Sequence, residues 1–189
     1  LYVIGNPGQE DLIRGGGGND TIYGVFGDDT IYGGTGQDTL IGGQGDDLID
    51  GGAGDDAADV LSGGDDADTF TGVGIGDDVQ GGAGGNDHDT LDLRGSVAAG
   101  GSLHVNITGP DSDGNGVDGT VDYFDNLGGL TGTLTFSNIE NIIPCFTPGT
   151  TIATPTGERL IEDLKVGDKI ITRDNGIQEI RWTGKRLLQ

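Results

Sequence analysis

Aspartates recur at nine-residue intervals near the start of the chain, and closely spaced glycines precede each of them. Residues 15–59 read GGGGNDTIY, GVFGDDTIY, GGTGQDTLI, GGQGDDLID and GGAGDDAAD. Carboxylates and backbone carbonyls supply the oxygen ligands that Ca²⁺ prefers. The spacing therefore favours a row of calcium sites built on the aspartate at the sixth place of each block, namely Asp20, Asp29, Asp38, Asp47 and Asp56.

Short strands and tight turns must position these aspartates. The blocks follow the pattern Gly-Gly-x-Gly-x-Asp-x-apolar-x. The glycines allow turns with positive φ, and the residues after the aspartate form a strand whose middle side chain points inward. Two blocks make one coil, which stacks Ile22 on Leu40 in one sheet and Ile31 on Ile49 in the other. Aspartates two blocks apart then pair as Asp20 with Asp38, Asp29 with Asp47 and Asp38 with Asp56.

The later blocks depart from this pattern. Ala58 takes the apolar place of the fifth block, and we expect an insertion, VLS, to follow that block. The next block, GGDDADTFT, keeps Asp68 and Phe70 in phase, so Asp68 is a further expected ligand. The block GVGIGDDVQ is degenerate, and we do not expect its Asp77 or Asp78 to bind metal. Glycine carbonyls complete the expected ligand set, from Gly16, Gly18, Gly34, Gly36, Gly43 and Gly45.

The chain is strongly acidic. It holds 32 Asp plus Glu against 9 Lys plus Arg, and residues 1–92 contain 20 of the acids with Arg14 as their only base. Nucleic acid is not an expected partner, because phosphate binding needs a basic face. No apolar run is long enough to suggest a membrane span, and the single cysteine, Cys145, excludes an internal disulfide. Four side chains of the repeat region are expected to face solvent: Asp28, Asp46, Asp55 and His88.

The blocks in residues 15–59 resemble the calcium-binding repeats of the RTX (haemolysin-type) family, and weaker copies extend the likeness over residues 5–92. The resemblance implies a parallel β-roll that binds several Ca²⁺ ions in a secreted bacterial protein. A thin apolar core and mutually repelling carboxylates oppose folding without a cation. We therefore expect residues 5–92 to fold on binding Ca²⁺. The alternatives are a disordered linker rich in glycine and aspartate, and a structural solenoid without metal.

Residues 93–144 lose the repeat and keep strand character. LHVNIT, GTVDYFD and GTLTFSNIENII are typical of strands, and TFSNIENI resembles the segment that follows the repeats in RTX proteins. We expect these strands to cap the roll, with His104 in a packed or edge position. Residues 111–122, DSDGNGVDGTVD, lie between two of these strands, and we expect them to form a polar hairpin connection. A calcium-binding loop is the alternative for these residues. The segment matches part of an EF-hand loop at Asp111, Asp113, Asn115, Gly116 and Asp122.

The composition changes at Cys145. The sequence that follows contains CFTPGT, TPTGERLIEDLKVGD and ITRDNGIQEIRW, and its Asp-Asn-Gly stretch predicts a β-hairpin. These motifs resemble the start of a Hint domain, the self-processing fold of Hedgehog proteins and inteins. The resemblance implies that the Cys145 thiol attacks the Pro144 carbonyl in a longer protein. We expect no processing by this chain, because the family's histidines follow the cysteine, whereas His88 and His104 precede Cys145.

These observations predict an all-β protein with three parts. They are a parallel β-roll of nonapeptide calcium repeats (1–92), a β-strand cap and connector (93–144) and the N-terminal fragment of a Hint domain (145–189). The chain has no methionine, so we expect it to be part of a longer protein.

The predicted function is that of a monomeric calcium-binding module in a secreted bacterial protein, with Ca²⁺ as its cofactor and no protein partner identified. A self-processing protein that cleaves or splices at Pro144–Cys145 and an adhesion or matrix stalk are the alternatives. A hydrolase is disfavoured, because the sequence has no HExxH or nucleophile-elbow motif.

Overall fold

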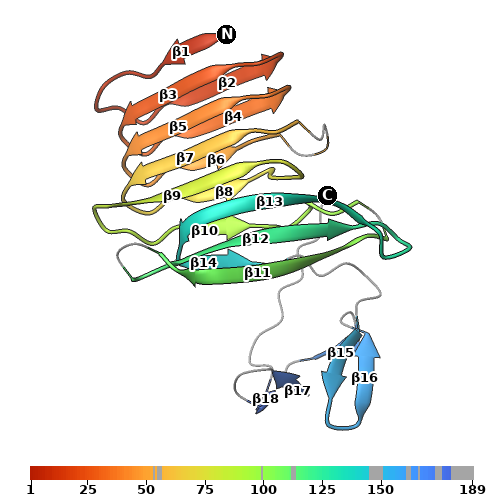
Figure 1. Ribbon diagram of the computed structural model, residues 1–189. Helices are drawn as coiled ribbons and strands as arrows, with labels where there is room; N and C mark the ends of the chain where they lie inside the picture. Colours follow the sequence, from red (N-terminus) through yellow and green to blue (C-terminus); the bar gives the residue numbers. More distant parts are fainter. Residues whose placement is uncertain are drawn as a thin grey trace. The chain divides into compact units, whose positions relative to one another are not determined.

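The computed structural model describes residues 1–52, 54, 57–98, 100–111, 114–144, 151–160, 163–165, 167–172 and 176–179. Contacts within the chain divide it into two compact units, Leu1–Cys145 and Phe146–Gln189. The regular structure of the described residues consists of β-strands, which confirms the predicted all-β class (Figure 1). Within these residues no helix is long and apolar enough to cross a membrane.

Two parallel sheets form a roll in the first unit. The chain alternates between the sheets, so that successive blocks of the repeat add strands to opposite sides (Figure 1). The first sheet contains β1 (Tyr2–Ile4), β3 (Thr21–Phe26), β5 (Thr39–Gln44), β7 (Val60–Asp65) and β9 (Asp78–Gly84). The second sheet contains β2 (Leu12–Gly17), β4 (Thr30–Thr35), β6 (Leu48–Asp50), β8 (Thr69–Thr71) and β10 (Thr90–Asp92). The predicted parallel β-roll is therefore confirmed.

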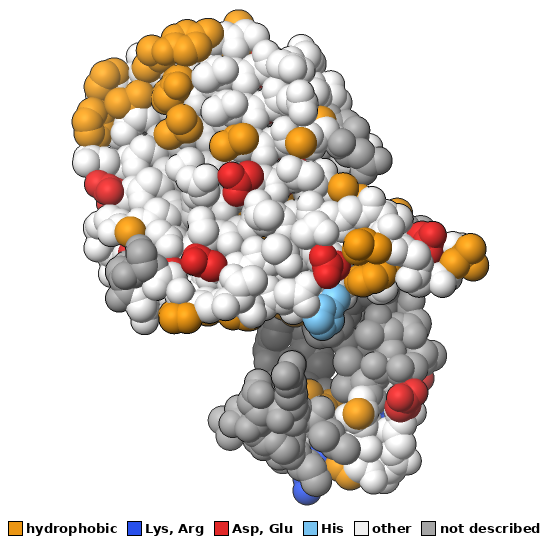
Figure 2. Space-filling view, viewed as in Figure 1, with side chains coloured by type: hydrophobic (Ala, Val, Ile, Leu, Met, Phe, Trp, Pro, Cys, Tyr) orange, Lys and Arg blue, Asp and Glu red, His pale blue; other side chains and the backbone are white. Residues whose placement is uncertain are grey.

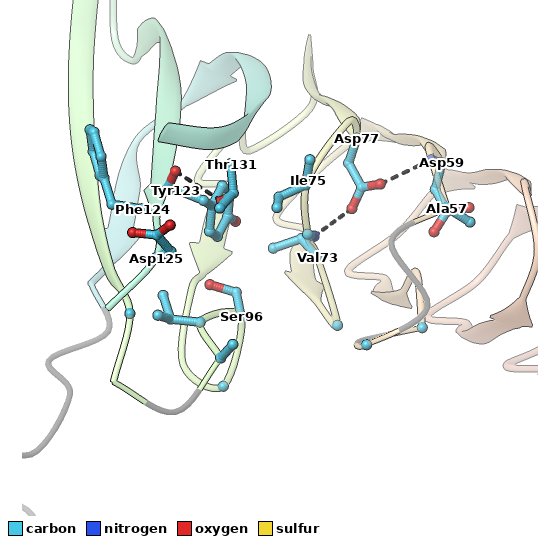
Figure 3. A pocket seen from close by; sticks show the side chains of 18 of the residues that line it. Ala57, Asp59, Val73, Ile75, Asp77, Ser96, Tyr123, Phe124, Asp125 and Thr131 are labelled. Atoms are coloured by element: carbon cyan, nitrogen blue, oxygen red, sulfur yellow. Dashed lines mark hydrogen bonds between the residues drawn. The ribbon is translucent and has the colours of Figure 1, made fainter. Parts of the chain in front are cut away.

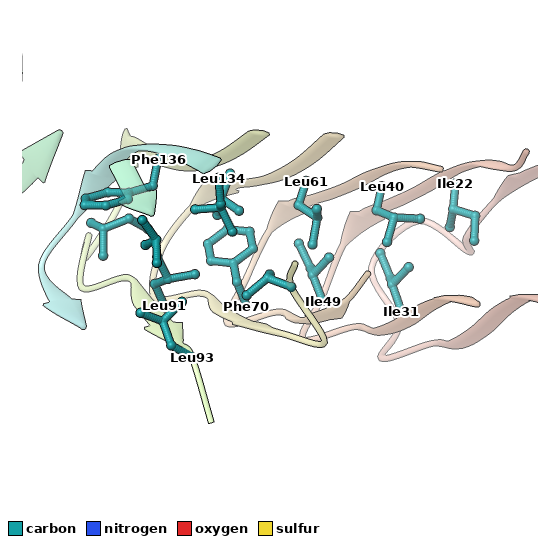
Figure 4. Packing of buried hydrophobic residues seen from close by; sticks show 14 of the residues in the cluster. Ile22, Ile31, Leu40, Ile49, Leu61, Phe70, Leu91, Leu93, Leu134 and Phe136 are labelled. Atoms are coloured by element: carbon teal, nitrogen blue, oxygen red, sulfur yellow. The ribbon is translucent and has the colours of Figure 1, made fainter. Parts of the chain in front are cut away.

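The apolar side chains stack inside the roll as the repeat predicts. Ile22 pairs with Leu40 across β3 and β5, and Ile31 pairs with Ile49 across β4 and β6. All four side chains are fully buried. Figure 4 shows the inward side chains of both sheets as one row that leads from Ile22 toward the cap. The core of the roll is thus narrow, with one large buried apolar side chain from each strand between β2 and β10.

The insertion lies at a different point from the one predicted. Leu40 pairs with Leu61, and the backbone N–H of Asp38 donates to Asp59. The extra residues therefore precede Asp59, in the connection between β6 and β7, and Leu61 takes the apolar place instead of Ala58. Burying a leucine in the core removes more apolar surface from water than burying an alanine, which favours this register.

Antiparallel strands extend the first sheet beyond the roll. β13 (Leu130–Ile139) pairs in parallel with β9, β12 (Val117–Phe124) pairs with β13, and β11 (Ser102–Pro110) is the edge strand. His104 is exposed on the edge strand β11, which is one of the two positions, packed or edge, that the sequence predicts. β14 (Asn141–Ile143) pairs in parallel with β10 and ends the second sheet. The cap side chains that join the core are Leu93, Val121, Tyr123, Leu134, Phe136 and Ile139, of which Figure 4 labels Leu93, Leu134 and Phe136.

The two ends of the roll differ in what covers the core. At one end the cap strands continue the sheets and close the row of apolar side chains. At the other end, near β1, hydrophobic side chains gather on the face shown in Figure 2. The large apolar residues exposed at this end are Leu1, Tyr2, Ile4, Leu12 and Phe26.

The second unit contains two antiparallel hairpins. β15 (Thr151–Thr154) pairs with β16 (Gly157–Leu160), and β17 (Lys169–Thr172) pairs with β18 (Gly176–Glu179). The second of these is the hairpin that the Asp-Asn-Gly stretch predicts, although Asp174 and Asn175 lie outside the described residues. An ion pair of 2.9 Å joins Arg159 Nη1 to Asp168 Oδ2 and ties the first hairpin to the segment before β17.

Candidate metal centre

Two rows of acidic side chains follow the turns of the roll, and each member lies directly before a strand or at the cap. The first ladder precedes strands of the first sheet and consists of Asp20, Asp38, Asp59 and Asp77. The second ladder precedes strands of the second sheet and consists of Asp11, Asp29, Asp47, Asp68 and Asp89, followed by Glu140 of the cap.

One carboxylate oxygen of each aspartate holds the neighbouring coil. The backbone N–H of one member donates to Oδ1 of the next, as in the bonds from Asp20 to Asp38 (2.8 Å) and from Asp29 to Asp47 (2.7 Å). These two predicted pairs therefore lie next to each other in the structure. The remaining N···O distances are 2.8 Å (Asp38 to Asp59), 2.9 Å (Asp59 to Asp77), 2.7 Å (Asp11 to Asp29), 2.9 Å (Asp47 to Asp68), 2.8 Å (Asp68 to Asp89) and 2.5 Å (Asp89 to Glu140 Oε2).

The other carboxylate oxygen is left without a donor at many levels of the ladders. Within the part of the chain that the structure describes, no hydrogen-bond donor reaches Oδ2 of Asp20, Asp29, Asp47, Asp68 or Asp89. These side chains are buried, with at most 3% of any of the residues exposed. A buried carboxylate oxygen without a partner is costly, so each of these atoms requires a proton or a cation.

Glycine lets backbone carbonyls come close to these oxygens. A Cβ on Gly33 would lie 2.5 Å from Asp38 Oδ2 and 2.7 Å from the carbonyl oxygen of Gly51, so both oxygens face the same small space. A Cβ on Gly34 would overlap the carbonyl oxygen of Gly16, which shows how closely the turns stack. The six glycines predicted as ligands have φ values in the left-handed region: Gly16 (100°), Gly18 (89°), Gly34 (111°), Gly36 (104°), Gly43 (130°) and Gly45 (120°).

Burial raises the pKa of four carboxyl groups in the second ladder, those of Asp29, Asp47, Asp68 and Asp89. It is the largest cause of the rise in the pKa of Asp47 from 3.8 to about 7, to which the carboxylate of Asp29 adds. Burial likewise raises the pKa of Asp68 to about 8 and that of Asp89 to about 7. Without a cation the ladder therefore favours neutral carboxyl groups. A bound Ca²⁺ ion favours the charged form instead, because it supplies the missing positive charge.

One predicted ligand is replaced in the ladder. Asp56 lies outside the described residues, and Asp59 occupies the level of the first ladder next to Asp38. Asp59 is buried, with 3% of the residue exposed. The predicted pairing of Asp38 with Asp56 is therefore wrong, because the extra residues precede Asp59 and shift the register.

Several ladder residues were not predicted from the sequence, although a simple signal marks those of the roll as candidates. In the roll, a core residue follows every ladder aspartate two positions later, including Ile13 after Asp11 and Val79 after Asp77. This Asp-x-apolar signal persists where the glycines are lost, so the degenerate block still contributes Asp77 to the first ladder. The missed members are Asp11, Asp59, Asp77, Asp89 and Glu140.

The side chains expected to face solvent are exposed where the structure describes them. Asp28, Asp46 and His88 are exposed, and Asp55 lies outside the described residues. Asp28 Oδ1 nevertheless accepts the backbone N–H of Asp46 at 3.0 Å. The exposed aspartates therefore share the coil-to-coil hydrogen bond of the ladders but not their burial.

The segment after β11 is a hairpin connection. The carboxylate of Asp111 accepts the backbone N–H groups of Gly114 (2.6 Å) and Gly116 (2.7 Å), which closes the turn between β11 and β12. Asp122 lies further along β12, opposite His104, and does not join this turn. The hairpin interpretation is therefore confirmed for the described residues, and Asp113 lies outside them.

A cavity of about 690 Å³ lies where the first ladder ends (Figure 3). Asp59 and Asp77 line it together with Tyr123 of the cap. Both oxygens of Asp77 accept backbone hydrogen bonds, Oδ1 from Asp59 (2.9 Å) and Oδ2 from Gly74 (2.6 Å). The first ladder thus ends in a carboxylate that the protein satisfies itself, whereas the second ladder continues into Glu140 of the cap.

Cys145, the predicted nucleophile, lies outside the described residues. Pro144, whose carbonyl it would attack, is exposed at the end of the described part of the first unit.

Comparison with known families finds matches in two separate parts of the chain, and these parts contain the motifs noted in the sequence. A model of the RTX calcium-binding nonapeptide repeat matches residues 8–31 and 23–57. A model of the Hint domain matches residues 144–189. Searches of curated proteins and of solved structures found no match. The chain thus carries RTX calcium-binding nonapeptide repeats over residues 8–57 and a stretch of Hint domain over residues 144–189.

Proposed function

We propose that this chain is the calcium-binding module of a secreted bacterial protein and that its roll folds when it binds Ca²⁺ outside the cell. The observation that carries the proposal is the series of buried Oδ2 atoms without a hydrogen-bond donor, described above for Asp20, Asp29, Asp47 and Asp68. Calcium supplies positive charge, accepts flexible geometry and prefers oxygen ligands, so it fits this set of donors.

The two oxygens of each ladder carboxylate and the glycine carbonyls would have different roles in binding the ions. The Oδ1 atoms fix each coil to the next through backbone hydrogen bonds, and the Oδ2 atoms provide charge for the ions. The glycine carbonyls supply neutral oxygen ligands close to the carboxylates. The expected ligands are Asp20, Asp29, Asp38, Asp47, Asp59 and Asp68, with the carbonyls of the turns that contain Gly16, Gly18, Gly34, Gly36, Gly43 and Gly45.

Calcium-dependent folding follows from the same features. The net charge of −23 opposes compaction, and the narrow core contributes little apolar burial for each coil. Binding free energy then becomes folding free energy, because the stacked sites do not exist in the unfolded chain. A module of this kind stays unfolded at cytosolic calcium and folds at extracellular calcium, where typical dissociation constants are on the order of 10⁻⁴–10⁻³ M.

Limited proteolysis tests this function. Millimolar Ca²⁺ should protect the segment 5–92 from a broad-specificity protease that does not itself need calcium, and the same concentration of Mg²⁺ should not. Magnesium is the matched control, because it carries the same charge and dehydrates reluctantly. Equal protection by both ions, or by neither, would contradict a calcium-specific fold.

A second function concerns the longer protein and rests on the Hint match that begins at residue 144. There the Cys145 sulfur would add to the Pro144 carbonyl carbon, the C–N bond would break, and the amine nitrogen would take up a proton. The products of this step are a thioester at Pro144 and a free α-amine on Cys145.

Mass spectrometry distinguishes this function from the first. A protein with a complete Hint domain should yield a fragment that ends at Pro144 when treated with hydroxylamine, and the Cys145→Ala variant should not. This 189-residue chain should stay intact under the same treatment. An intact long protein, with or without Cys145, would exclude self-processing and leave the calcium function untouched.

A further inference from the structure

The second ladder ends in a cluster of carboxylates that does not belong to the matched repeats. One oxygen each from Asp87, Asp89 and Glu140 lies within 4.8 Å of the others. Asp87 and Asp89 come from the connection between β9 and β10, whereas Glu140 joins β13 to β14 in the cap. The cluster therefore connects the last coil of the roll to the cap, at residues distant in sequence and outside residues 8–57.

Each carboxylate in the cluster uses one oxygen to fix its position. Asp89 Oδ1 accepts the N–H of Asp68 (2.8 Å), Glu140 Oε2 accepts the N–H of Asp89 (2.5 Å), and Asp87 Oδ2 accepts the Asn115 side-chain amide (3.3 Å). Backbone and side-chain donors of the last coil and the cap thus hold one oxygen of each carboxylate in place.

The second oxygen of each carboxylate has no hydrogen-bond donor. Among the described residues, nothing donates to Asp87 Oδ1, Asp89 Oδ2 or Glu140 Oε1, and all three atoms are buried. Asp87 is 8% exposed and Asp89 is fully buried. Three unpartnered carboxylate oxygens therefore meet in one buried space, which is unfavourable unless a cation or protons occupy it.

Basic side chains do not neutralise this cluster in the described part of the chain. The ion pairs there join Leu1 to Asp20, Arg94 to Asp92 and Arg159 to Asp168. A further carboxylate is close, because a Cβ on Gly116 would overlap Glu140 Oε1 and lie 2.6 Å from Asp111 Oδ2. The surroundings of the cluster are thus negative as well.

The backbone of the cap also imitates a turn of the roll here. The carbonyl oxygen of Asn138 faces the position that a Cβ on Gly81 would take, next to Asp89 Oδ2. In the repeats a glycine carbonyl occupies the equivalent place, as Gly51 does beside Asp38 Oδ2. Asn138 therefore replaces the glycine and Glu140 replaces the aspartate of a further coil.

We propose that Asp87, Asp89 and Glu140 bind one additional Ca²⁺ ion, with the carbonyl of Asn138 beside it, and that this ion attaches the cap to the last coil. The ligands are all oxygen, which suits calcium and disfavours zinc and other metals that prefer nitrogen or sulfur. The ion would join residues 51 positions apart in the chain, so calcium would order the cap together with the roll. This inference extends the proposed calcium function to a site that the repeat pattern does not contain.

The number of bound ions in the full chain tests the proposal. Native mass spectrometry at increasing Ca²⁺ should show one ion fewer on the Glu140→Gln variant than on the wild-type chain at saturation. The glutamine carbonyl can still accept the Asp89 N–H, and its amide can donate to the carboxylates that the ion would otherwise bridge. Glu158→Gln is the matched control, because Glu158 is exposed in the second unit and its replacement should remove no ion.

Each outcome has a definite meaning. An unchanged ion count in Glu140→Gln would overturn the cap site while leaving the proposed function intact, provided that the wild-type chain binds several ions. A wild-type chain that binds no calcium would overturn both. If Glu140→Gln does not regain β-structure at saturating Ca²⁺, the Asp87→Asn variant provides the test. The side-chain carbonyl of the new asparagine can still accept the hydrogen bond from the Asn115 amide. One ion fewer in that variant supports the site, and an unchanged count overturns it.

Discussion

At the scale of single residues, Asp29, Asp47, Asp68 and Asp89 each do two different things with their two oxygens. Oδ1 of Asp47 accepts the N–H of Asp29 and joins two coils, while Oδ2 of Asp47 remains buried and without a donor. A serine could do the first but carries no charge for the second. The repeat therefore requires a carboxylate, and the calcium dependence that we propose for the roll rests on the oxygen that the protein leaves unpaired.

Asp47→Asn separates these two roles. The asparagine carbonyl can keep the bond to Asp29, whereas its amide removes the charge that burial opposes. We expect the variant to lower the calcium affinity of the roll by at least about tenfold, since a lost charged ligand is worth more than about 1.4 kcal/mol. Without calcium it should be as stable as the wild-type chain or more stable.

Asp46→Asn is the control for this variant, because Asp46 is the exposed neighbour and also accepts a backbone N–H. Calcium titrations of the two variants, followed by circular dichroism, should differ in midpoint. Identical midpoints would contradict the assignment of Asp47 as a ligand.

The glycines provide a second prediction at this scale. Gly34 has φ of 111° and its Cα faces the carbonyl of Gly16, whereas Gly8 has φ of 78° with open space around it. Gly8→Ala should lower the free energy of unfolding by about 1–2 kcal/mol, which is the cost of the left-handed conformation alone. Gly34→Ala should cost clearly more, because its methyl group overlaps backbone. Urea unfolding in saturating Ca²⁺ measures both, and equal losses would show that close stacking is unimportant.

At the scale of the elements, the second ladder places buried carboxyl groups with raised pKa values in one row. Burial raises the pKa of Asp47 to about 7 and that of Asp68 to about 8, from 3.8 in the unfolded chain. The folded roll without metal therefore binds more protons than the unfolded chain. Its stability is retained below about pH 3.8 and is lost as the pH rises through 7 to 8.

We accordingly expect acid to replace calcium in part. Metal-free chain should gain β-structure as the pH falls from 8 toward 4, and its calcium affinity should fall over the same range because protons compete for the same oxygens. Circular dichroism at a series of pH values measures the first effect. In the Asp47→Asn, Asp68→Asn double variant, the β-structure of the metal-free chain should depend less on pH. A metal-free wild-type chain that is most folded at pH 8 would contradict the pKa argument.

The repeat predicted the elements of the roll well, because glycine spacing and a single apolar residue per block fix the strand period. Ile22, Leu40, Ile31 and Ile49 stack as expected. The prediction was wrong where two aspartates competed for one place, since Asp56 and Asp59 are each followed by an apolar residue. Only the packing of Leu61 on Leu40 decides between them, and packing is a property of the folded state.

Glu140 of the cap was not predicted from the sequence for a different reason. The cap strands could be expected from β-branched residues, but Glu140 joins the second ladder through a contact with Asp89 that is distant in sequence. No nine-residue spacing leads to it. Such a member becomes visible only when β13 and β14 continue the two sheets beyond β9 and β10.

At the scale of the whole molecule, the chain combines two units with different compositions. Residues 1–92 carry 20 acids and one base, whereas residues 145–189 carry six acids and seven bases. Charge repulsion, and hence calcium, acts mainly on the first unit. The hairpins of the second unit contain no carboxylate ladder among the described residues and include the Arg159–Asp168 ion pair. Calcium is therefore expected to control the folding of the roll and cap and to have little influence on the second unit.

The measurement that tests this account most directly is a calcium titration of the full chain by far-ultraviolet circular dichroism, with excess EGTA at neutral pH as the starting point. The account predicts a spectrum without the β signal of the roll in EGTA and a cooperative gain of β-structure as Ca²⁺ rises, with a midpoint on the order of 10⁻⁴–10⁻³ M. Renewed EGTA should reverse the change. A full β spectrum in EGTA that calcium does not alter would contradict the account.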